Sequence, residues 1–482
     1  MVGSGPGGAT LAYRLAAAGR KVTVVEAGPR VTPDKMFSDV GRTLASYFWD
    51  GGTRTVRGNV FFPTLQARAL GGGSVFNSAI CMRPTEAALE RWREEHGLTE
   101  FTREALAPHF AAVEAFYHIK PTDEAVMGRR NQLFREACDT LGWSSDPIQR
   151  FEEGCRGSGN CILGCRHEAK NSMDRRGLRE VAELGGKVYA SIHVDELIVD
   201  RGRVRGVVGA AIDPRTHARG PEVRIHAACT ILAAGAVGTP TVMRNSGFRR
   251  DVVGSKLRFH PSCYVVGVLD EAVNPWNGAT QGVHTSQHLD RGIKLEALWA
   301  TASTFSRGFP KQPKQFKRYL KRWPNMAVFD GWISGDASEG QVRTLPGGRP
   351  DLTYTLHESD LRRLQEANAL LCEMFAAVGA REVITGINGL PDVMDPADAL
   401  KEIRSSRFGM TDLPTASNHV MGGSPMGADP ERAVCDGWGK AYDADDLYIA
   451  DTGLFPTSPG VNPQLTAMAL AWRLGGELPG RY

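Results

Sequence analysis

Apolar positions along the chain follow two periods, one typical of helices and one typical of strands. Near the start, the Ala- and Leu-rich residues 9–18 predict a helix, and the β-branched residues 21–26 predict a strand that ends on a carboxylate. A short apolar strand is predicted at residues 230–232, and residues 467–474 predict another helix. This mixture of short apolar strands and helices indicates an α/β fold.

The middle of the chain has a different pattern. Between residues 251 and 409, strand-like runs alternate with loops, and one long helix is predicted at residues 359–378. This order predicts an antiparallel sheet backed by helices. The strand-like runs are residues 263–269, 293–300, 325–333 and 352–356.

Length and charge narrow the class of protein. At 482 residues the chain exceeds a typical domain, so we expect two intergrown domains. Its 57 basic and 54 acidic residues give a formal net charge of +3 without a long run of one sign, which argues against a nucleic-acid partner. We find neither an apolar run of about 18 residues nor a secretory leader, and we expect a cytoplasmic protein.

The first motif is a glycine-rich turn at residues 3–8. Gly3, Gly5 and Gly8 occupy the glycine positions of a dinucleotide-binding turn, where the backbone approaches a pyrophosphate at a helix N-terminus. Glu26 lies near the usual spacing of about 20 residues, where an acid accepts hydrogen bonds from ribose hydroxyls. Glutamate favours FAD or NAD over NADP. A glycine-rich turn in another kind of α/β protein is the alternative.

The strand that normally feeds such a turn is short in this sequence. Only Met1 and Val2 precede Gly3, whereas the motif usually follows a strand of about five residues. We therefore expect the start of the chain to be clipped or misassigned, and we expect an apolar extension to raise thermal stability.

Further segments combine glycines with polar side chains. Residues 70–77 read Leu-Gly-Gly-Gly-Ser-Val-Phe-Asn, and residues 233–240 read Ala-Ala-Gly-Ala-Val-Gly-Thr-Pro. Residues 447–456 and 460–466 lead into the last predicted helix. Together with residues 3–8, and in this order, these segments resemble the glucose-methanol-choline (GMC) family of FAD-dependent oxidoreductases over nearly the whole chain.

The resemblance extends to residues 253–261, which read Val-Gly-Ser-Lys-Leu-Arg-Phe-His-Pro, whereas Gly73 stands where the family commonly has serine. It implies a Rossmann-like FAD-binding domain interleaved with a substrate domain built on an antiparallel sheet backed by helices. The implied division is residues 1–250 for FAD binding with inserted segments at about 85–180, residues 251–409 for the substrate, and residues 410–482 for a return to the FAD-binding domain.

The resemblance also implies which residues hold FAD. The first glycine turn and Glu26 would hold the ADP half, and Val194 would meet the adenine through its backbone. The later segments would follow the pyrophosphate and the flavin. The implied cofactor residues are Gly3, Gly5, Gly8, Glu26, Gly72, Ser74, Asn77, Val194, Ala234, Gly235, Asp451, Asn462, Pro463 and Thr466.

A histidine and an asparagine are the implied catalytic residues. Residues 419–427 match the family's H-x-x-G-x-x-x-M-G segment, and Asn462 stands where the family has a second His or Asn. Alcohol oxidation removes a hydride from carbon and a proton from oxygen, and an imidazole of pKa about 6.5 suits the proton. The resemblance implies that His419 is the base and that Asn462 donates to the same oxygen. A buried histidine satisfied by backbone carbonyls is the alternative.

No acid or second histidine lies near His419 in the sequence, so we expect its partners to be the flavin and Asn462. His260, in the His-Pro pair of the 253–261 stretch, is expected to make a structural hydrogen bond near the cofactor and to stay outside the catalytic set.

Three of the nine cysteines, Cys155, Cys161 and Cys165, are clustered among glycines. We favour a loop of reduced, buried or paired thiols without metal. An iron–sulfur cluster on these three cysteines, or zinc with His167 as a fourth ligand, is the alternative.

The expected function is FAD-dependent oxidation of a small-molecule alcohol to an aldehyde or ketone. Residues 257–278 look more like members that act on long-chain or hydrophobic alcohols than like sugar-oxidising members. The alternatives are a non-redox lyase, a photodecarboxylase, an iron–sulfur sugar dehydrogenase subunit or an electron-transfer flavoprotein. The sequence does not decide whether oxygen, a quinone or a protein is the electron acceptor.

Two features of the middle region bear on the surroundings of the site. Basic residues recur along residues 311–322. A solvated helix face is the favoured interpretation, and contact with a membrane surface or an acidic partner is the alternative. Five aromatic residues there either line the substrate pocket or belong to the core. They are Trp276, Trp299, Phe305, Phe329 and Trp332.

Overall fold

A parallel sheet built from both ends of the chain forms the first core. In the computed structural model, which describes residues 1–481, Val2 bridges Val25 on one side and Leu232 on the other, both in parallel. The strand predicted at residues 21–26 is therefore present, and the first two residues take the central position beside it. The paired strands are β1 (Thr23–Val25) with β7 (Lys187–Tyr189), and β11 (Thr230–Leu232) with β21 (Leu447–Ile449).

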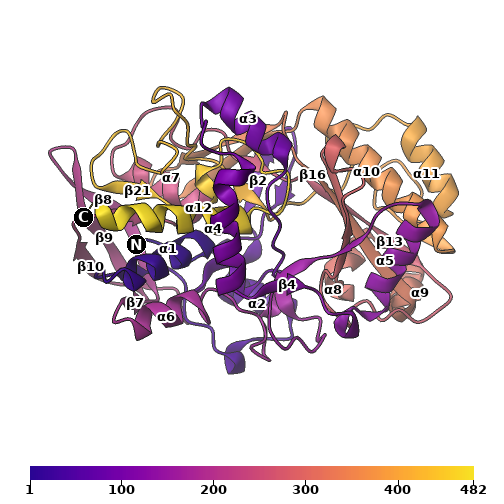
Figure 1. The fold of residues 1–482 in the computed structure, drawn as a ribbon. Coiled ribbons are helices and arrows are strands. Elements are labelled where there is room, and N and C mark those ends of the chain that lie inside the picture. The colour runs from indigo at the N-terminus through magenta and orange to yellow at the C-terminus, as the bar shows by residue number, and fades with distance from the viewer. Residues whose placement is uncertain (482) are drawn as a thin grey trace.

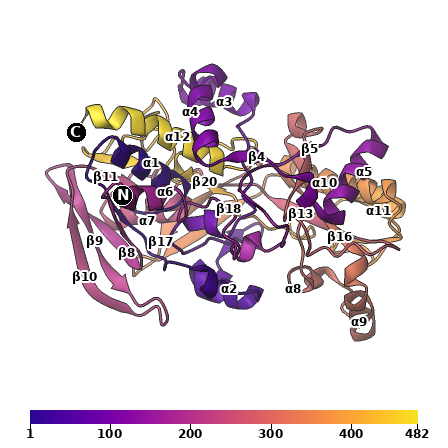
Figure 2. The same cartoon turned by 60° about the horizontal axis from the view of Figure 1, so that its bottom comes forward.

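Two helices far apart in sequence pack together over this sheet. They are α1 (Pro6–Ala17) and α12 (Gln464–Glu477), drawn in indigo and yellow side by side in Figures 1 and 2. A Cβ on Gly475 would lie 2.4 Å from the Cβ of Arg14, so only glycine lets the two helices approach this closely. The sequence predicts both helices, at residues 9–18 and 467–474. The helix α4 (Arg103–Phe116) packs on α12 and α6 (Gly177–Glu183) packs on α1. A further helix, α7 (Gly235–Asn245), follows β11 and packs on β8.

A three-stranded antiparallel ribbon lies along the edge of this lobe, in the order β10-β9-β8. Figure 2 shows it as the outermost layer on the side of the two chain ends. Ile192 N donates to Glu26 O at 2.8 Å, which brings the start of the ribbon to the end of β1. The strands are β8 (Ile192–Asp200), β9 (Arg203–Ile212) and β10 (Arg219–His226).

The predicted antiparallel sheet forms the second lobe, which Figure 1 shows in orange and brown. Its strand order is β19-β13-β16-β15-β14-β5, with every pair antiparallel. The helix α10 (Glu358–Ala377) covers one face, as predicted. The strands are β5 (Asp146–Pro147), β13 (Ser262–Val268), β14 (Val283–Thr285), β15 (Ile293–Ala297), β16 (Met326–Ile333) and β19 (Glu382–Ile384).

Two segments differ from the sequence expectation. The run at 352–356 is a strand, but it belongs to a separate sheet of order β17-β18-β2-β3, because alternation predicts a strand without specifying its partner. The second segment lies inside the 85–180 insertion, where β5 and α5 (Gly128–Leu141) pack onto the substrate sheet. The other strands are β2 (Thr55–Gly58), β3 (Phe62–Pro63), β17 (Glu339–Thr344) and β18 (Pro350–Thr355).

The two faces of the substrate sheet differ in polarity. Residues paired across strands project from the same face, and the pairs Lys294 with Trp332 and Glu296 with Asp330 place four polar or aromatic groups on one face. On the other face Phe329 stacks on Phe375 of α10, with ring centroids 4.3 Å apart. The α10 face is thus an ordinary core, and the opposite face carries buried ionisable groups.

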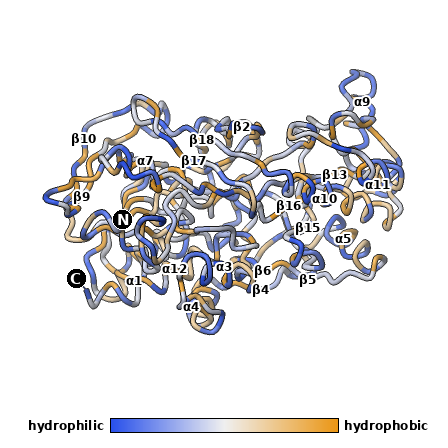
Figure 3. The backbone as a smooth tube through the Cα atoms, turned by 90° about the horizontal axis from the view of Figure 1, so that it is seen from above, coloured by the Kyte–Doolittle hydropathy of each residue, from blue (hydrophilic) through white to orange (hydrophobic). Residues whose placement is uncertain are grey.

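One basic helix stands at the far end of the substrate lobe. It is α9 (Pro313–Lys321), which projects from the chain trace in Figure 3. Its basic side chains are exposed while Tyr319 is buried, as expected for a solvated face. Contact with a membrane surface or an acidic partner stays a prediction. None of the helices within residues 1–481 combines the length and the apolar character that crossing a membrane requires.

Candidate active site

The first glycine turn forms a cradle at the start of α1. Gly3 has φ 95°, and a Cβ there would lie 2.2 Å from Ala233 O, so this position requires glycine for folding. Gly5 is the N-cap of α1 without a side-chain hydrogen bond, and a Cβ there would meet nothing within 4 Å. An open space therefore faces uncapped helix amides, which fits the pyrophosphate of a dinucleotide.

Gly5→Ala is expected to fold normally but to bind FAD at least about tenfold more weakly, because the methyl group would fill the space that the pyrophosphate needs. The measurement is FAD affinity by fluorescence titration, together with the melting temperature of the flavin-free protein. Gly3→Ala is the contrast, since its methyl group would clash with Ala233 O and lower the melting temperature itself. Full FAD loading of Gly5→Ala would contradict the assignment.

Glu26 ends β1 beside this cradle. Its carboxylate accepts from Ser4 N at 3.0 Å, Ser4 Oγ at 2.7 Å and Gly28 N at 2.8 Å. Burial raises the pKa of Glu26, and these hydrogen bonds act against the shift. Oε2 accepts both bonds from Ser4, whereas Oε1 accepts only from Gly28 N and keeps a lone-pair site that fits a ribose hydroxyl. Val194 follows Ile192 in β8, so the structure brings it to the same end of the sheet.

The second glycine segment packs directly on the first. Gly71 N donates to Ser4 Oγ at 2.9 Å, and a Cβ on Gly72 would lie 2.7 Å from the Cα of Gly5. Ser74 Oγ donates to Gly71 O at 2.7 Å and accepts from Met173 N at 3.0 Å, so it holds the loop in place. The two predicted cofactor segments are thus brought together.

A buried lysine, which the motifs did not single out, fastens this loop. Lys170 Nζ donates to three carbonyl oxygens, Val75 O at 2.7 Å, Asn77 O at 2.8 Å and Cys161 O at 2.9 Å. Burial lowers the pKa of Lys170 to about 8. The residue therefore ties the predicted flavin loop to the cysteine loop.

Asp451 is held by three hydrogen bonds within the protein. Its carboxylate accepts from Thr239 Oγ1 at 2.6 Å, Gly235 N at 2.9 Å and Gly453 N at 2.6 Å, and burial raises its pKa. Ala234 N donates to Thr239 Oγ1 at 3.1 Å. These bonds join the start of α7 to the segment after β21, and a contact with FAD stays a prediction.

The start of α12 offers unused polar groups. Pro463 is its N-cap, without a side-chain hydrogen bond. Gln464 Oε1 accepts from Asn77 Nδ2 at 2.5 Å, but Gln464 Nε2 and Thr466 Oγ1 are buried with no partner among the described residues. Orphaned polar atoms beside an uncapped helix N-terminus fit the polar edge of a flavin. The residues present thus fit FAD at this place.

His419 and Asn462 meet as predicted, and His260 joins them. The strand β20 (Val420–Met421) pairs with β12 (Arg258–Phe259) antiparallel, with Phe259 opposite Val420. This register brings together the residues that flank the pair, and His419 Nδ1 lies 3.0 Å from His260 Nδ1. His419 Nε2 lies 3.3 Å from Asn462 Nδ2. The expected partners of His419 were the flavin and Asn462, and strand pairing adds His260 from a distant segment.

His260 is held from two further sides. Its Nε2 lies 2.6 Å from Ser458 Oγ, and its ring stacks on Trp332 with centroids 4.4 Å apart and planes 4° apart. Trp332, one of the five aromatic candidates, thus lies at the site. Phe329 projects into the core instead, and Trp299 is buried.

An ion pair from the polar face of the substrate sheet completes the cluster. Lys294 Nζ donates to Asn462 Oδ1 at 3.0 Å and to Glu296 Oε1 at 2.5 Å, and both ionised side chains are fully buried. Glu296 also accepts from Trp332 Nε1 at 2.9 Å and from Gln281 Nε2 at 2.9 Å. Alternation within β15 is the only sequence signal that puts Lys294 and Glu296 on one face.

The charges of this cluster follow from burial and proximity. Burial favours the neutral form of Glu296, but the Lys294 ammonium outweighs it and lowers the pKa of that carboxyl. Burial and the Glu296 charge raise the pKa of Asp330 well above its usual value. Lys294 and Glu296 therefore favour the buried ion pair, whereas the shift at Asp330 favours its protonated form.

Both imidazoles are neutral at neutral pH. Burial lowers the pKa of His419 to about 4, with Glu296 raising and Lys294 lowering it to smaller extents. Burial, His419 and Lys294 lower the pKa of His260 well below its usual value. The His419 side chain is only half-buried, so a small molecule can reach it. The arrangement offers an uncharged nitrogen beside an amide donor.

The cysteine loop contains an unusual thiol. Cys161 Sγ lies 3.1 Å from Arg150 Nη2. Burial favours the protonated thiol, but Arg150 and Lys170 outweigh burial and lower its pKa. Within residues 1–481, no group of three or more His, Cys, Asp or Glu side chains is placed to hold a metal ion. The iron–sulfur and zinc alternatives therefore have no assembled site in the part of the chain that is described.

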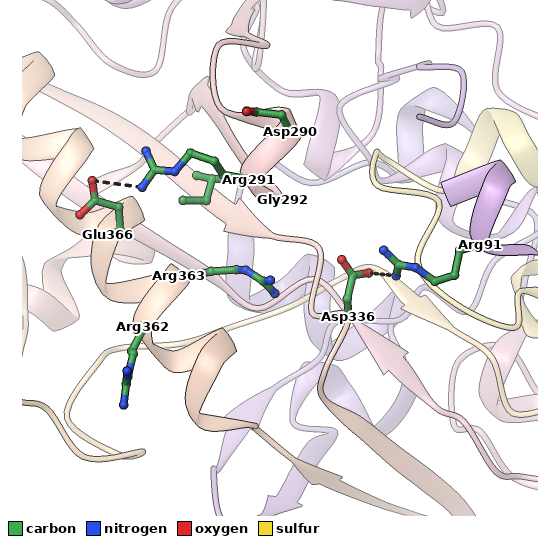
Figure 4. Close-up of a pocket in the computed structure, with 9 residues that line it drawn as sticks. Arg91, Asp290, Arg291, Gly292, Asp336, Arg362, Arg363 and Glu366 are labelled. Atoms are coloured by element: carbon green, nitrogen blue, oxygen red, sulfur yellow. Dashed lines mark ion pairs between the residues drawn. The ribbon is translucent and has the colours of Figure 1, made fainter. Parts of the chain in front are cut away.

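A separate charged cavity of about 460 Å³ opens between α3 (Glu86–His96) and the start of α10. Figure 4 shows its two ion pairs, Arg91 with Asp336 at 2.6 Å and Arg291 with Glu366 at 3.5 Å. Its lining contains none of the predicted site residues. It consists of Arg91, Asp290, Arg291, Gly292, Ile293, Asp336, Arg362, Arg363 and Glu366.

The glycine cradle, together with a neutral imidazole beside the Asn462 amide, fits a flavin-dependent oxidoreductase. The chain belongs to the GMC oxidoreductase family, whose N-terminal and C-terminal models match residues 44–262 and 336–471. An NAD(P)-binding Rossmann-like domain model matches residues 1–51. The protein is accordingly an FAD-dependent oxidoreductase that acts on CH–OH donors, with the predicted α/β fold.

Similar proteins and solved structures include members of this kind of enzyme. An uncharacterized GMC-type oxidoreductase of Mycobacterium tuberculosis is 32% identical over 98% of this chain and 74% of its own length. Long-chain-alcohol oxidase FAO3 of Arabidopsis thaliana is 26% identical over 98% of this chain and 66% of its own length. The crystal structure of pyridoxine 4-oxidase from Mesorbium loti has a TM-score of 0.73 at 17% identity, covering 99% of this chain and 98% of that one.

Proposed function

We propose that the protein oxidises a primary or secondary alcohol to an aldehyde or ketone, with His419 as the base. The observation that carries this proposal is the pairing of His419 Nε2 with Asn462 Nδ2 at 3.3 Å. Bound FAD supplies the hydride acceptor. His419 takes the hydroxyl proton on Nε2, and the Asn462 amide donates to the same oxygen and stabilises its developing negative charge.

We further propose a long-chain or otherwise hydrophobic alcohol as the substrate. The Arabidopsis relatives named long-chain-alcohol oxidases align with nearly the whole chain, which supports this class. The polar groups at the reacting centre are engaged with one another through Glu296, so they leave few free partners for additional substrate hydroxyls.

Anaerobic mixing with a panel of alcohols tests the proposal. The panel contains long-chain primary alcohols, short primary and secondary alcohols, and sugars, and the measurement is loss of the oxidised flavin absorbance. Bleaching by the long-chain alcohols at the lowest concentrations supports the proposal. Bleaching by sugars alone would show that the substrate is a sugar and not a hydrophobic alcohol. No bleaching by any alcohol, combined with cleavage of a cyanohydrin, would indicate a lyase instead.

The acid limit of the reaction is expected near pH 4. Because burial lowers the pKa of His419 to about 4, the base is neutral and competent at neutral pH and is lost only when the pH falls toward 4. The rate constant for flavin reduction at low alcohol concentration should therefore stay level between pH 7 and about 5. A decline that already centres near pH 6.5 would contradict the buried environment of His419.

A further inference from the structure

Lys294 determines which atom donates and which accepts in the contact between Asn462 and His419. An ammonium only donates hydrogen bonds, so the Asn462 atom 3.0 Å from Lys294 Nζ must be the carbonyl oxygen. The amide nitrogen of Asn462 therefore faces His419 Nε2 at 3.3 Å. An amide nitrogen also only donates, and His419 must present a lone pair on Nε2.

The same polarity continues through the second imidazole. A neutral His419 with its lone pair on Nε2 carries the proton on Nδ1, which lies 3.0 Å from His260 Nδ1. His260 Nδ1 must then accept, and the proton of His260 lies on Nε2, 2.6 Å from Ser458 Oγ. From Lys294 through Asn462, His419 and His260 to Ser458, each residue therefore donates one hydrogen bond to the next.

Burying the Lys294 ammonium costs free energy, which supports a functional reason for this residue. Lys294 and Glu296 are fully buried, and their carboxylate–ammonium contact measures 2.5 Å. Replacing a buried ion pair by apolar side chains of similar volume often leaves stability unchanged or raises it. Stability alone therefore does not account for Lys294, whereas its contact with Asn462 connects it to the reacting centre.

We propose that Lys294, held by Glu296, is a positioning residue that fixes the amide orientation of Asn462 and thereby the tautomer of His419. His260 and Ser458 are positioning residues at the other end, where His260 Nδ1 accepts a hydrogen bond from His419 Nδ1 and Ser458 Oγ accepts one from His260 Nε2. The basic Nε2 of His419 is then directed at the substrate oxygen in every molecule. This inference rests on the proposed function, because it assigns a task to the residues around that base.

The loss of Lys294 has a defined consequence. Without the ammonium, the Asn462 amide is free to turn by about 180° because its two ends have nearly the same shape. A turned amide places its oxygen against His419 Nε2 and favours the tautomer with the proton on Nε2. That tautomer cannot accept the proton of an alcohol, so the active fraction falls.

Lys294→Met and Lys294→Arg test the proposal by two independent readouts. The first is the nitrogen NMR spectrum of histidine-labelled protein, with and without FAD, in which His419 is assigned by comparison with His419→Gln. We expect the proton on Nδ1 in the parent and a mixture of tautomers in Lys294→Met. The second readout is anaerobic flavin reduction, which should slow at least about tenfold in its limiting rate, with partial recovery in Lys294→Arg.

An unchanged His419 tautomer in Lys294→Met would overturn the proposal, and so would an unchanged limiting rate of flavin reduction. Lys120→Met, an exposed lysine outside the site, is the control for loss of a positive charge and should match the parent. The NMR readout does not depend on turnover, so an inactive His419 would defeat the proposed function while the tautomer result still decides this inference.

A double variant covers the case in which Lys294→Met does not fold. Lys294→Met with Glu296→Leu removes both charges and keeps an apolar side chain at each position. The proposal expects the same mixture of His419 tautomers in this folded variant. A parent-like tautomer there would show that Asn462 and His260 hold the ring without the cation, and it would overturn the proposal.

Discussion

Replacing His419 with alanine is expected to slow flavin reduction by an alcohol at least about a hundredfold, because removing a general base typically costs that much or more. FAD should remain bound, since the cradle at α1 and the start of α12 are built from other residues. The measurement is the limiting rate of anaerobic reduction in a stopped-flow instrument, with the flavin content determined by absorbance.

The control for His419→Ala is His226→Ala, which removes an exposed imidazole from β10. This variant should reduce at the parent rate. Parent-like reduction in His419→Ala itself would remove the residue from the mechanism, and a loss of FAD in that variant would point to a role in cofactor binding instead.

Glu296→Ala should lower the free energy of unfolding by about 3–5 kcal/mol, the usual effect of removing one partner of a buried ion pair. Lys294 would keep a buried charge without its carboxylate. Trp332 Nε1 and Gln281 Nε2 would also lose their acceptor. Urea unfolding of the flavin-free protein, followed by circular dichroism, gives the change directly.

The double variant Lys294→Met with Glu296→Leu separates the effect of the unpaired Lys294 charge from other effects. It should recover most of the unfolding free energy that Glu296→Ala loses, because neither charge remains buried. Glu183→Ala removes one partner of an exposed ion pair with Arg179 and should cause little change. If Glu296→Ala unfolds at the same urea concentration as the parent, Lys294 cannot be a buried cation in the folded protein.

Most of the cofactor-binding frame could be predicted from local patterns. The Ala-rich run that became α1, the β-branched run that became β1 and the glycines before α1 are adjacent in sequence, so their spacing alone indicates a dinucleotide turn. His419 and Asn462 were singled out by the resemblance to the GMC family, because each lies in a short segment that matches a pattern of that family.

The remaining site residues lie in segments whose spacing carries no signal. Lys170 approaches the flavin loop from the cysteine segment and binds only carbonyl oxygens, which every residue possesses. The run at 352–356 was predicted as a strand of the substrate sheet, but it pairs with β2 and β17. Alternation reveals that a segment is a strand, whereas its partner depends on contacts with distant segments.

The sequence by itself determined the α/β class and the dinucleotide turn, because these depend on residues that are close along the chain, and its family resemblance pointed to His419 as the proposed base. Only the tertiary structure decided the surroundings of that base. The β12–β20 pairing brings His260 to His419, and the register of β15 with β16 directs Lys294 toward Asn462. Pairing and register depend on the packing of the whole core, so no single segment of the chain contains that information.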